Sequence, residues 1–307
     1  MLMPAFAAPS LSTALSKESF AKLPALSCKR LSGSINAGYD TNYVGRGLVV
    51  SHSVTEGDSS EFVALKLNYD VGKKDYWSID SAIGYKMVSS GHTLYGPKPY
   101  DTLAMLGHPI PYKNIENEFA VVTGARFKAK YGQIAFGHNF VHGGLLGAMA
   151  KHFRGEGASA VNELYFTTIL NLPQAPWLET GLTTRYSFSG IQGWWFEPYI
   201  TFKAPVIGTK ENPTLVTTLT LGMSATLGYF DEEYVACANG AQAYWIKLAT
   251  PWYVTKDIIL TPSLSFNWLG NGGMKANRHG SFKPLNPSYV PFQNFAVVAG
   301  VSCTYVF

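Results

Sequence analysis

The chain has 307 residues, of which 24 are Lys or Arg and 20 are Asp or Glu, so 14% are charged where an ordinary soluble domain carries about 25%. Aromatic residues are equally frequent at 14%, which excludes a disordered chain, and no run approaches the roughly 18 to 20 apolar residues of a membrane-spanning helix, which excludes a helical membrane bundle. The formal net charge of +4 comes from dispersed basic residues, so we expect no nucleic-acid partner.

Residues 1–32 precede the first periodic pattern and are predicted to form an N-terminal extension. The sequence Ala5-Phe-Ala7 has the A-x-A form of a secretory cleavage site, so we expect a remnant of a signal peptide followed by a periplasmic segment. Cys28, Cys237 and Cys303 are an odd number at wide spacing, so no disulfide framework is predicted. We expect no metal site and no cofactor.

From residue 34 onward apolar and polar residues alternate, which is the two-residue period of a β-strand. In the first segment Ile35, Tyr39 and Tyr43 share one face, and Asn36 and Asp40 share the other. The pattern predicts an all-β fold with twelve strands, near residues 35–43, 63–71, 77–87, 117–129, 132–141, 162–170, 178–188, 194–204, 214–229, 242–250, 258–268 and 294–307.

Charge within these segments falls on one face only. In a membrane barrel a Lys or Arg facing lipid at mid-depth costs about 2–4 kcal/mol, whereas the lumen tolerates it. A soluble β-sandwich would also alternate, but its wide aromatic faces would then have to pack into a dry core. The pattern therefore favours a transmembrane antiparallel up-and-down barrel over residues 33–307, with a charged lumen. The predicted lumen-lining residues, seven basic and seven acidic, are Asp40, Lys66, Asp70, Asp80, Lys86, Glu118, Arg126, Lys128, Glu163, Glu179, Arg185, Glu197, Lys203 and Lys247.

The predicted connections alternate in length. Those after even-numbered segments are short, and those after odd-numbered segments are mostly longer, near 47–60, 89–115, 142–157, 230–240 and 270–290, with only 189–193 tight. Outer-membrane barrels have this asymmetry, with short periplasmic turns and longer outer loops. The sequence leaves open whether the 89–115 loop or the N-terminal segment closes the lumen. The basic loop at 270–290 could bind lipopolysaccharide phosphates.

Two motifs carry a resemblance. The final strand ends in Tyr305-Val-Phe307 and resembles the C-terminal signal strand of Gram-negative outer-membrane proteins. The opening strand, with Arg46-Gly47 at its end, is similar to the element that begins the TorF-like putative porins. The resemblance implies a bacterial outer-membrane location, contact with outer-membrane lipid and lipopolysaccharide, and assembly by the barrel-assembly machinery through the C-terminal strand.

The lumen composition predicts a channel. Because the inward charges cancel, and because twelve strands lie between filled eight-stranded barrels and open sixteen-stranded ones, we expect a narrow passage for passive diffusion of small polar solutes. By the same alternation Tyr165, Trp177, Tyr199 and Trp245 face inward, where they could line a solute path by stacking or simply fill the lumen.

Two other functions stay open. One is an outer-membrane barrel enzyme acting on lipids, for which His138, His142 and His152 are the local candidates. No Ser lies beside these histidines at the spacing of such enzymes, and we expect no enzymatic activity. The other is a structural or adhesive barrel that displays its long surface loops.

Overall fold

The structure is a computed structural model. It describes residues 30–46, 48–49, 59–71, 76–89, 117–144, 146–147, 160–189, 192–208, 213–228, 239–274 and 293–307. The predicted extension up to residue 29, His152, most of the 89–115 loop and residues 275–290 of the basic loop lie outside these residues.

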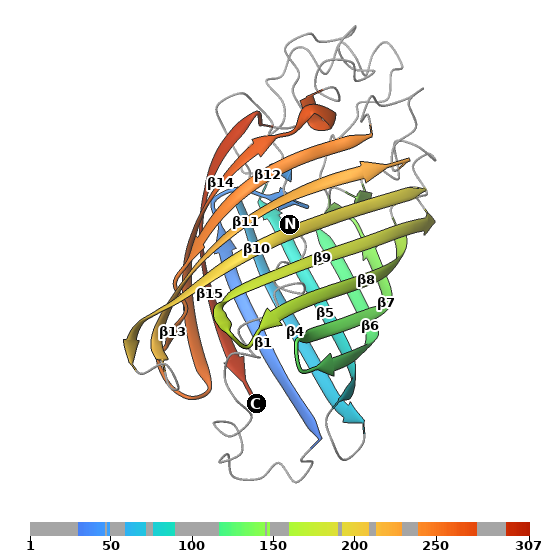
Figure 1. The fold of residues 1–307 in the computed structure, drawn as a ribbon. Coiled ribbons are helices and arrows are strands. Elements are labelled where there is room, and N and C mark those ends of the chain that lie inside the picture. Colours follow the sequence, from blue (N-terminus) through green and yellow to red (C-terminus); the bar gives the residue numbers. More distant parts are fainter. Residues whose placement is uncertain are drawn as a thin grey trace, which may run out of the picture.

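Twelve long strands form one antiparallel sheet that closes on itself (Figure 1). They are β1 (Leu31–Asp40), β4 (Ser59–Val71), β5 (Trp77–Ser89), β6 (Glu118–Ala129), β7 (Gly132–His142), β8 (Ala160–Leu172), β9 (Ala175–Ser189), β10 (Gly193–Gly208), β11 (Pro213–Leu227), β12 (Gly240–Ala249), β14 (Ile258–Leu269) and β15 (Phe295–Val306). Three two-residue strands are β2 (Val44–Gly45), β3 (Leu48–Val49) and β13 (Trp252–Tyr253).

Each long strand pairs with its neighbours along the chain, and β1 pairs with β15 to close the barrel. The closing register runs from Ser34 opposite Val306 to Asp40 opposite Gly300. The prediction of an all-β, up-and-down barrel with twelve strands is therefore confirmed. Among the described residues no helix has the length and apolar character needed to cross a membrane.

The connections differ at the two ends of the barrel. At the end where the chain terminates they are short, with Lys130–Tyr131 between β6 and β7 and residues 173–174 between β8 and β9. At the opposite end residues 41–58, 90–116, 143–159, 228–239 and 270–294 separate the long strands, and only 190–192 make a tight connection. This is the asymmetry that the sequence predicts.

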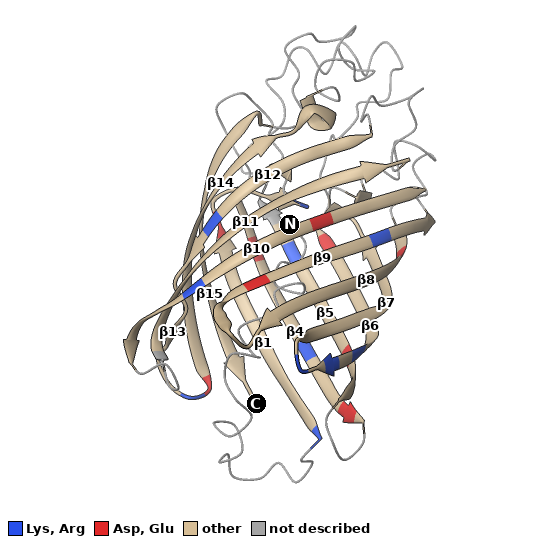
Figure 2. Cartoon of the chain, viewed as in Figure 1, with Lys and Arg blue, Asp and Glu red and all other residues tan. Residues whose placement is uncertain are grey.

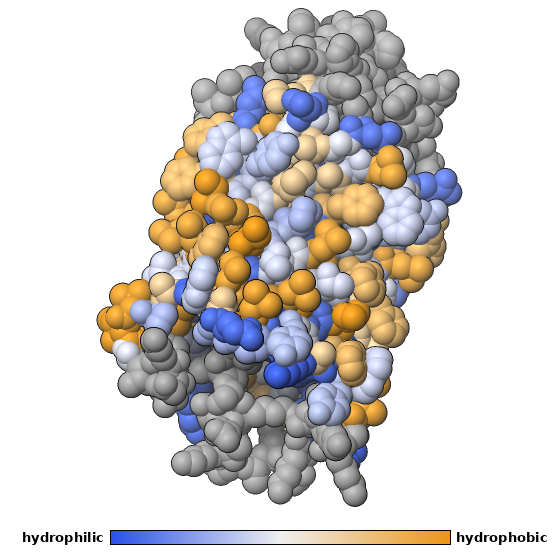
Figure 3. Space-filling model, viewed as in Figure 1, coloured by the Kyte–Doolittle hydropathy of each residue, from blue (hydrophilic) through white to orange (hydrophobic). Residues whose placement is uncertain are grey.

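The outer surface of the wall is apolar (Figure 3). On β5 the exposed side chains are Trp77, Ile79, Ile83, Tyr85 and Met87, which alternate with inward ones. Large apolar side chains are likewise exposed on every other long strand except β6. Such a surface is far larger than the apolar patches that soluble monomers expose, and it fits contact with lipid.

Candidate functional site: the barrel lumen

All fourteen predicted charged residues alternate along their strands with the exposed apolar residues, which assigns them to the inner side of the wall. Figure 2 marks the charged positions along the strands. Six of the fourteen are almost completely buried: Lys86, Glu118, Arg126, Glu163, Glu179 and Arg185. A buried charge is stable only when it is paired or hydrogen-bonded, so their partners define the chemistry of the lumen.

Several lumen charges are paired along the wall. Arg126 on β6 forms an ion pair with Asp80 on β5, and Asp80 also accepts a hydrogen bond from Asn68 Nδ2 at 2.5 Å. On the other side of the barrel Lys203 Nζ on β10 lies 2.7 Å from Glu179 Oε2 on β9. Each of these contacts joins neighbouring strands, so it neutralises charge on the wall without reaching across the lumen.

A short hairpin occupies the lumen at the end opposite the chain terminus. It comprises β2 and β3 with the three residues Thr41–Tyr43 before them, and we call it the lumen hairpin. The sequence predicts that the first strand continues to Tyr43 with its ring toward lipid. That prediction is wrong, because β1 ends at Asp40 and the Tyr43 side chain is fully buried inside the barrel.

The root of the lumen hairpin is attached to β15. The backbone N–H of Thr41 donates to the carbonyl of Ala299 at 2.8 Å, and Thr41 Oγ1 accepts from the N–H of Ala299 at 3.0 Å. On the other arm, the carbonyl of Val49 accepts from Gln293 N at 3.0 Å. An apolar cluster completes the attachment and consists of Val44, Val49, Ala296 and Val298.

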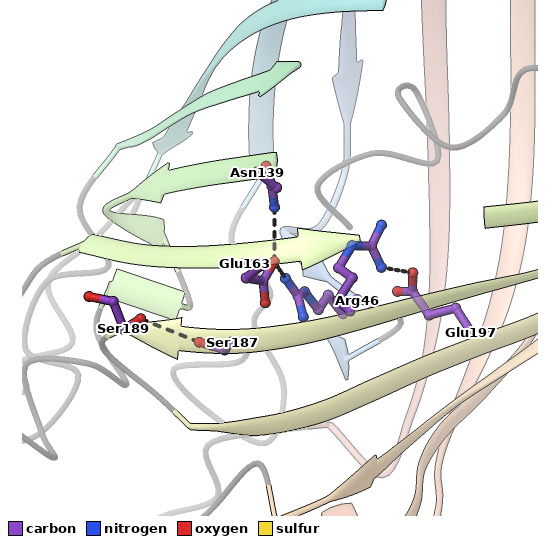
Figure 4. Close-up of polar contacts among 7 residues, drawn as sticks. Arg46, Asn139, Glu163, Ser187, Ser189 and Glu197 are labelled. Atoms are coloured by element: carbon purple, nitrogen blue, oxygen red, sulfur yellow. Dashed lines mark hydrogen bonds and ion pairs between the residues drawn. The ribbon is translucent and has the colours of Figure 1, made fainter. Parts of the chain in front are cut away.

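The tip of the lumen hairpin reaches a different part of the wall (Figure 4). The Arg46 guanidinium forms an ion pair with Glu163 on β8 and lies 5.1 Å from the ring centre of Trp195 on β10. Glu163 also accepts a hydrogen bond from Asn139 Nδ2 at 2.9 Å. Both charged side chains of the pair are buried, with 4% of Arg46 and none of Glu163 exposed.

Tyr43 makes a third attachment, to β5 and β6. Its hydroxyl donates to Glu118 Oε2 at 2.9 Å, and Lys86 Nζ lies 4.8 Å from the centre of its ring. Gly144, which follows β7, closes over this contact: a methyl group there would come within 2.3 Å of Glu118 Oε2 and 2.7 Å of the Tyr43 hydroxyl. Only glycine fits at this position.

The hairpin therefore crosses the barrel. In the closed order of twelve long strands β15 and β8 are six places apart, which puts the root and the Arg46 contact on opposite walls. Arg46 adds an eighth basic side chain to the seven predicted, against seven acidic ones. Sequence reasoning placed Arg46 at the end of the opening strand, beyond the alternating segment that ends at Tyr43, and so did not assign it to the lumen. The only local signal is an Arg between Gly45 and Gly47.

Inward-facing aromatic rings lie against the wall over glycines of nearby strands. An added Cβ at Gly181 would come within 2.5 Å of the Tyr199 ring, and one at Gly222 within 2.4 Å of the Trp245 ring. Tyr165 on β8 reaches past β7 to Gly124 on β6, where its hydroxyl would lie 2.2 Å from an added Cβ. Because these rings lie over the backbone of the wall, they line the lumen without projecting across it.

Trp177 does not share this arrangement, and the prediction that it faces inward is wrong. Its side chain is 52% exposed and stacks on Phe202, with ring centres 6.2 Å apart and planes at 13°. Phe202 belongs to the outward-facing set of β10. Trp177 therefore lies on the outer surface near the end of the barrel with the short turns.

The histidines proposed for lipid chemistry are not gathered into a catalytic arrangement among the described residues. His138 Nε2 is 3.1 Å from Asn162 Oδ1, and the His138 ring centre is 6.0 Å from that of Phe188 on the outer face. His142 is exposed at the end of β7. No three His, Cys, Asp or Glu side chains in the described ranges are placed to hold a metal ion.

Comparisons with known proteins give similarity in structure only. No protein-family model matches the chain, and no curated protein matches it. An outer membrane channel from Pseudomonas putida F1 is similar over 92% of this chain and 97% of its own, with 9% identity and a TM-score of 0.47. The NanC porin covers 89% of this chain and 98% of its own, with 12% identity and a TM-score of 0.44. The KdgM porin covers 89% and 99%, with 10% identity and a TM-score of 0.43.

Proposed function

We propose that the protein is a bacterial outer-membrane channel that lets small polar solutes diffuse passively through a narrow, charged lumen. The observation that carries the proposal is the division of side chains in a closed barrel: all fourteen predicted lumen charges fall on the inner side, and the outer side is mostly apolar, with Glu61 near the start of β4 as an exception. A polar interior suits a water-filled channel, and an apolar outer band suits contact with lipid.

The lumen composition also defines the selectivity that we propose. The eight basic and seven acidic side chains nearly cancel, and pairs such as Lys203–Glu179 neutralise one another on the wall. One-sign rings of charge give strong ion selectivity, and this lumen has none among its described residues. We therefore propose weak discrimination between anions and cations. Lipopolysaccharide and the barrel-assembly machinery are the partners that follow from an outer-membrane location.

Planar-bilayer recording tests the proposal. The protein, refolded in detergent and shown to be folded by its heat-modifiable gel mobility, should give reproducible conductance steps. Under a KCl gradient the reversal potential should stay near zero. A correctly folded barrel that remains silent at all voltages would overturn the channel function and favour a structural barrel.

A further inference from the structure

The lumen hairpin combines a fixed root with a tip held by side chains. At the root, Thr41 and Val49 use backbone hydrogen bonds to β15 and to Gln293, and their neighbours pack in an apolar cluster. At the tip, Arg46 forms the ion pair with Glu163 and lies against the Trp195 ring. Beside the root, Tyr43 donates its hydroxyl hydrogen bond to Glu118 on β6. A structure attached in this way can pivot about its root when the side-chain contacts break.

The hairpin cannot hold its own position. Among the described residues two pairs join its strands, Val44 with Val49 and Gly45 with Leu48. An isolated two-stranded hairpin is at best marginally stable, so the wall contacts decide where this one lies. Arg46 also has a positive φ of 53°, a conformation that is unfavourable for a residue with a side chain. The Arg46 side chain is held by its ion pair with Glu163.

We propose that the lumen hairpin is a gate and that Arg46 and Glu163 form the latch that keeps it closed. The inference rests on the proposed channel function and adds its regulation. In the closed state the hairpin bridges β15 and β8; when the latch opens, the hairpin swings toward its root and widens the passage. The open and closed states exist in equilibrium, and any change that weakens the latch shifts the population toward the open state.

Glu163→Gln is the primary variant, and Glu197→Gln is its matched control. Glu197 forms an ion pair with Arg185 on the neighbouring strand, so its substitution removes the same charge from the lumen at a pair that does not include Arg46 (Figure 4). Loss of a charge-assisted contact shifts an equilibrium by about tenfold or more. We expect Glu163→Gln and Arg46→Gln to raise the open probability in bilayer recordings by about tenfold relative to Glu197→Gln.

A charge swap distinguishes loss of the Arg46–Glu163 ion pair from a general effect of changing the charge of the lumen. The double variant Arg46→Glu with Glu163→Arg restores opposite charges at the two positions and should return the open probability toward that of the wild type. If the double variant stays as open as the single variants, or if Glu163→Gln and Glu197→Gln behave alike, the gate is refuted.

Thiol labelling measures the accessibility of a hairpin residue and does not depend on conductance. Leu48 is 1% exposed, so Leu48→Cys, in a protein whose three native cysteines are replaced by Ser, should react slowly with a polar thiol reagent. Adding Arg46→Gln should accelerate labelling by about tenfold, and adding Glu197→Gln should not. Equal labelling rates overturn the gate even if the channel conducts. Accelerated labelling in a folded but silent barrel supports the moving hairpin and overturns only the channel function.

Discussion

Exchanging one inward charge with its outward neighbour tests the orientation of the wall. Leu65 lies at the middle of β4 between Ile35 and Ile83, which are 44% and 43% exposed on the outer surface. Lys66, the next residue, faces the lumen. The double variant Leu65→Lys with Lys66→Leu keeps the composition and moves the positive charge from the lumen to the lipid-facing side.

The expected loss follows from the depth of the exchange. A Lys facing lipid at mid-depth costs about 2–4 kcal/mol. This corresponds to a decrease of roughly 30-fold to 700-fold in the ratio of folded to unfolded protein. The single variant Lys66→Leu serves as the control, because it removes the lumen charge and places none in lipid. The difference between the two variants isolates the lipid-facing charge.

Urea titration in lipid vesicles, followed by tryptophan fluorescence, gives the free energy of unfolding for each variant. We expect the double variant to be less stable than Lys66→Leu by about 2–4 kcal/mol. If the two variants agree within about 0.5 kcal/mol, which is the usual size of a neutral surface substitution, Leu65 does not face lipid and the assignment of inner and outer sides is wrong.

Two further predictions concern packing on the wall and at its seam. Gly181→Ala places a methyl group against the Tyr199 ring and pushes the ring into the lumen. We expect the free energy of unfolding, measured by urea titration, to fall by about 1–3 kcal/mol and the unit conductance to decrease. Unchanged values would contradict the position of the ring. Phe307→Ala removes a ring that covers Gly33 and stacks on Tyr305 on the outer side of the β1–β15 seam. We expect the free energy of unfolding to fall by about 0.5–1.5 kcal/mol, and assembly to slow in proteoliposomes that contain the assembly machinery. Wild-type stability and assembly rate would contradict this role of Phe307.

The barrel could be predicted from the sequence because its determinants are local. Successive side chains of a strand point to opposite faces, so the apolar Leu65 and the charged Lys66 indicate the lipid-facing side and the lumen side at adjacent positions. The same alternation repeats through every long strand. Connections that join each strand to the next antiparallel strand then give an up-and-down order. Closure by β1 and β15 follows once twelve such strands are connected.

The lumen hairpin could not be predicted in this way because its determinants are distant in sequence. Tyr43 continues the alternation of Tyr39, yet its partner Glu118 is 75 residues away, and the partner of Arg46, Glu163, is 117 residues away. No local pattern encodes such pairs. Alternation predicts that β1 continues, whereas the long-range contacts draw the chain inward after Asp40.

Trp177 shows a second limit of the alternation rule. It lies beyond Leu178, the last residue of β9 that pairs with β10, and the register of β9 against β8 shifts between Asn171 and Leu172. A register irregularity resets which face a side chain takes. Counting inward and outward positions from the middle of β9 therefore fails at its first residues, and the ring lies on the outer surface.

Passage of solutes through the charged lumen can be tested at two adjacent positions on β15. Ser302 faces the lumen and Cys303 faces outward, where it is exposed. In bilayers, a small charged thiol reagent should reduce the unit conductance of a Ser302→Cys channel whose native cysteines are replaced by Ser, and it should leave a channel with Cys303 as its only cysteine unchanged. Block through Cys303 alone, or an unblocked Ser302→Cys channel despite confirmed labelling, would contradict the account.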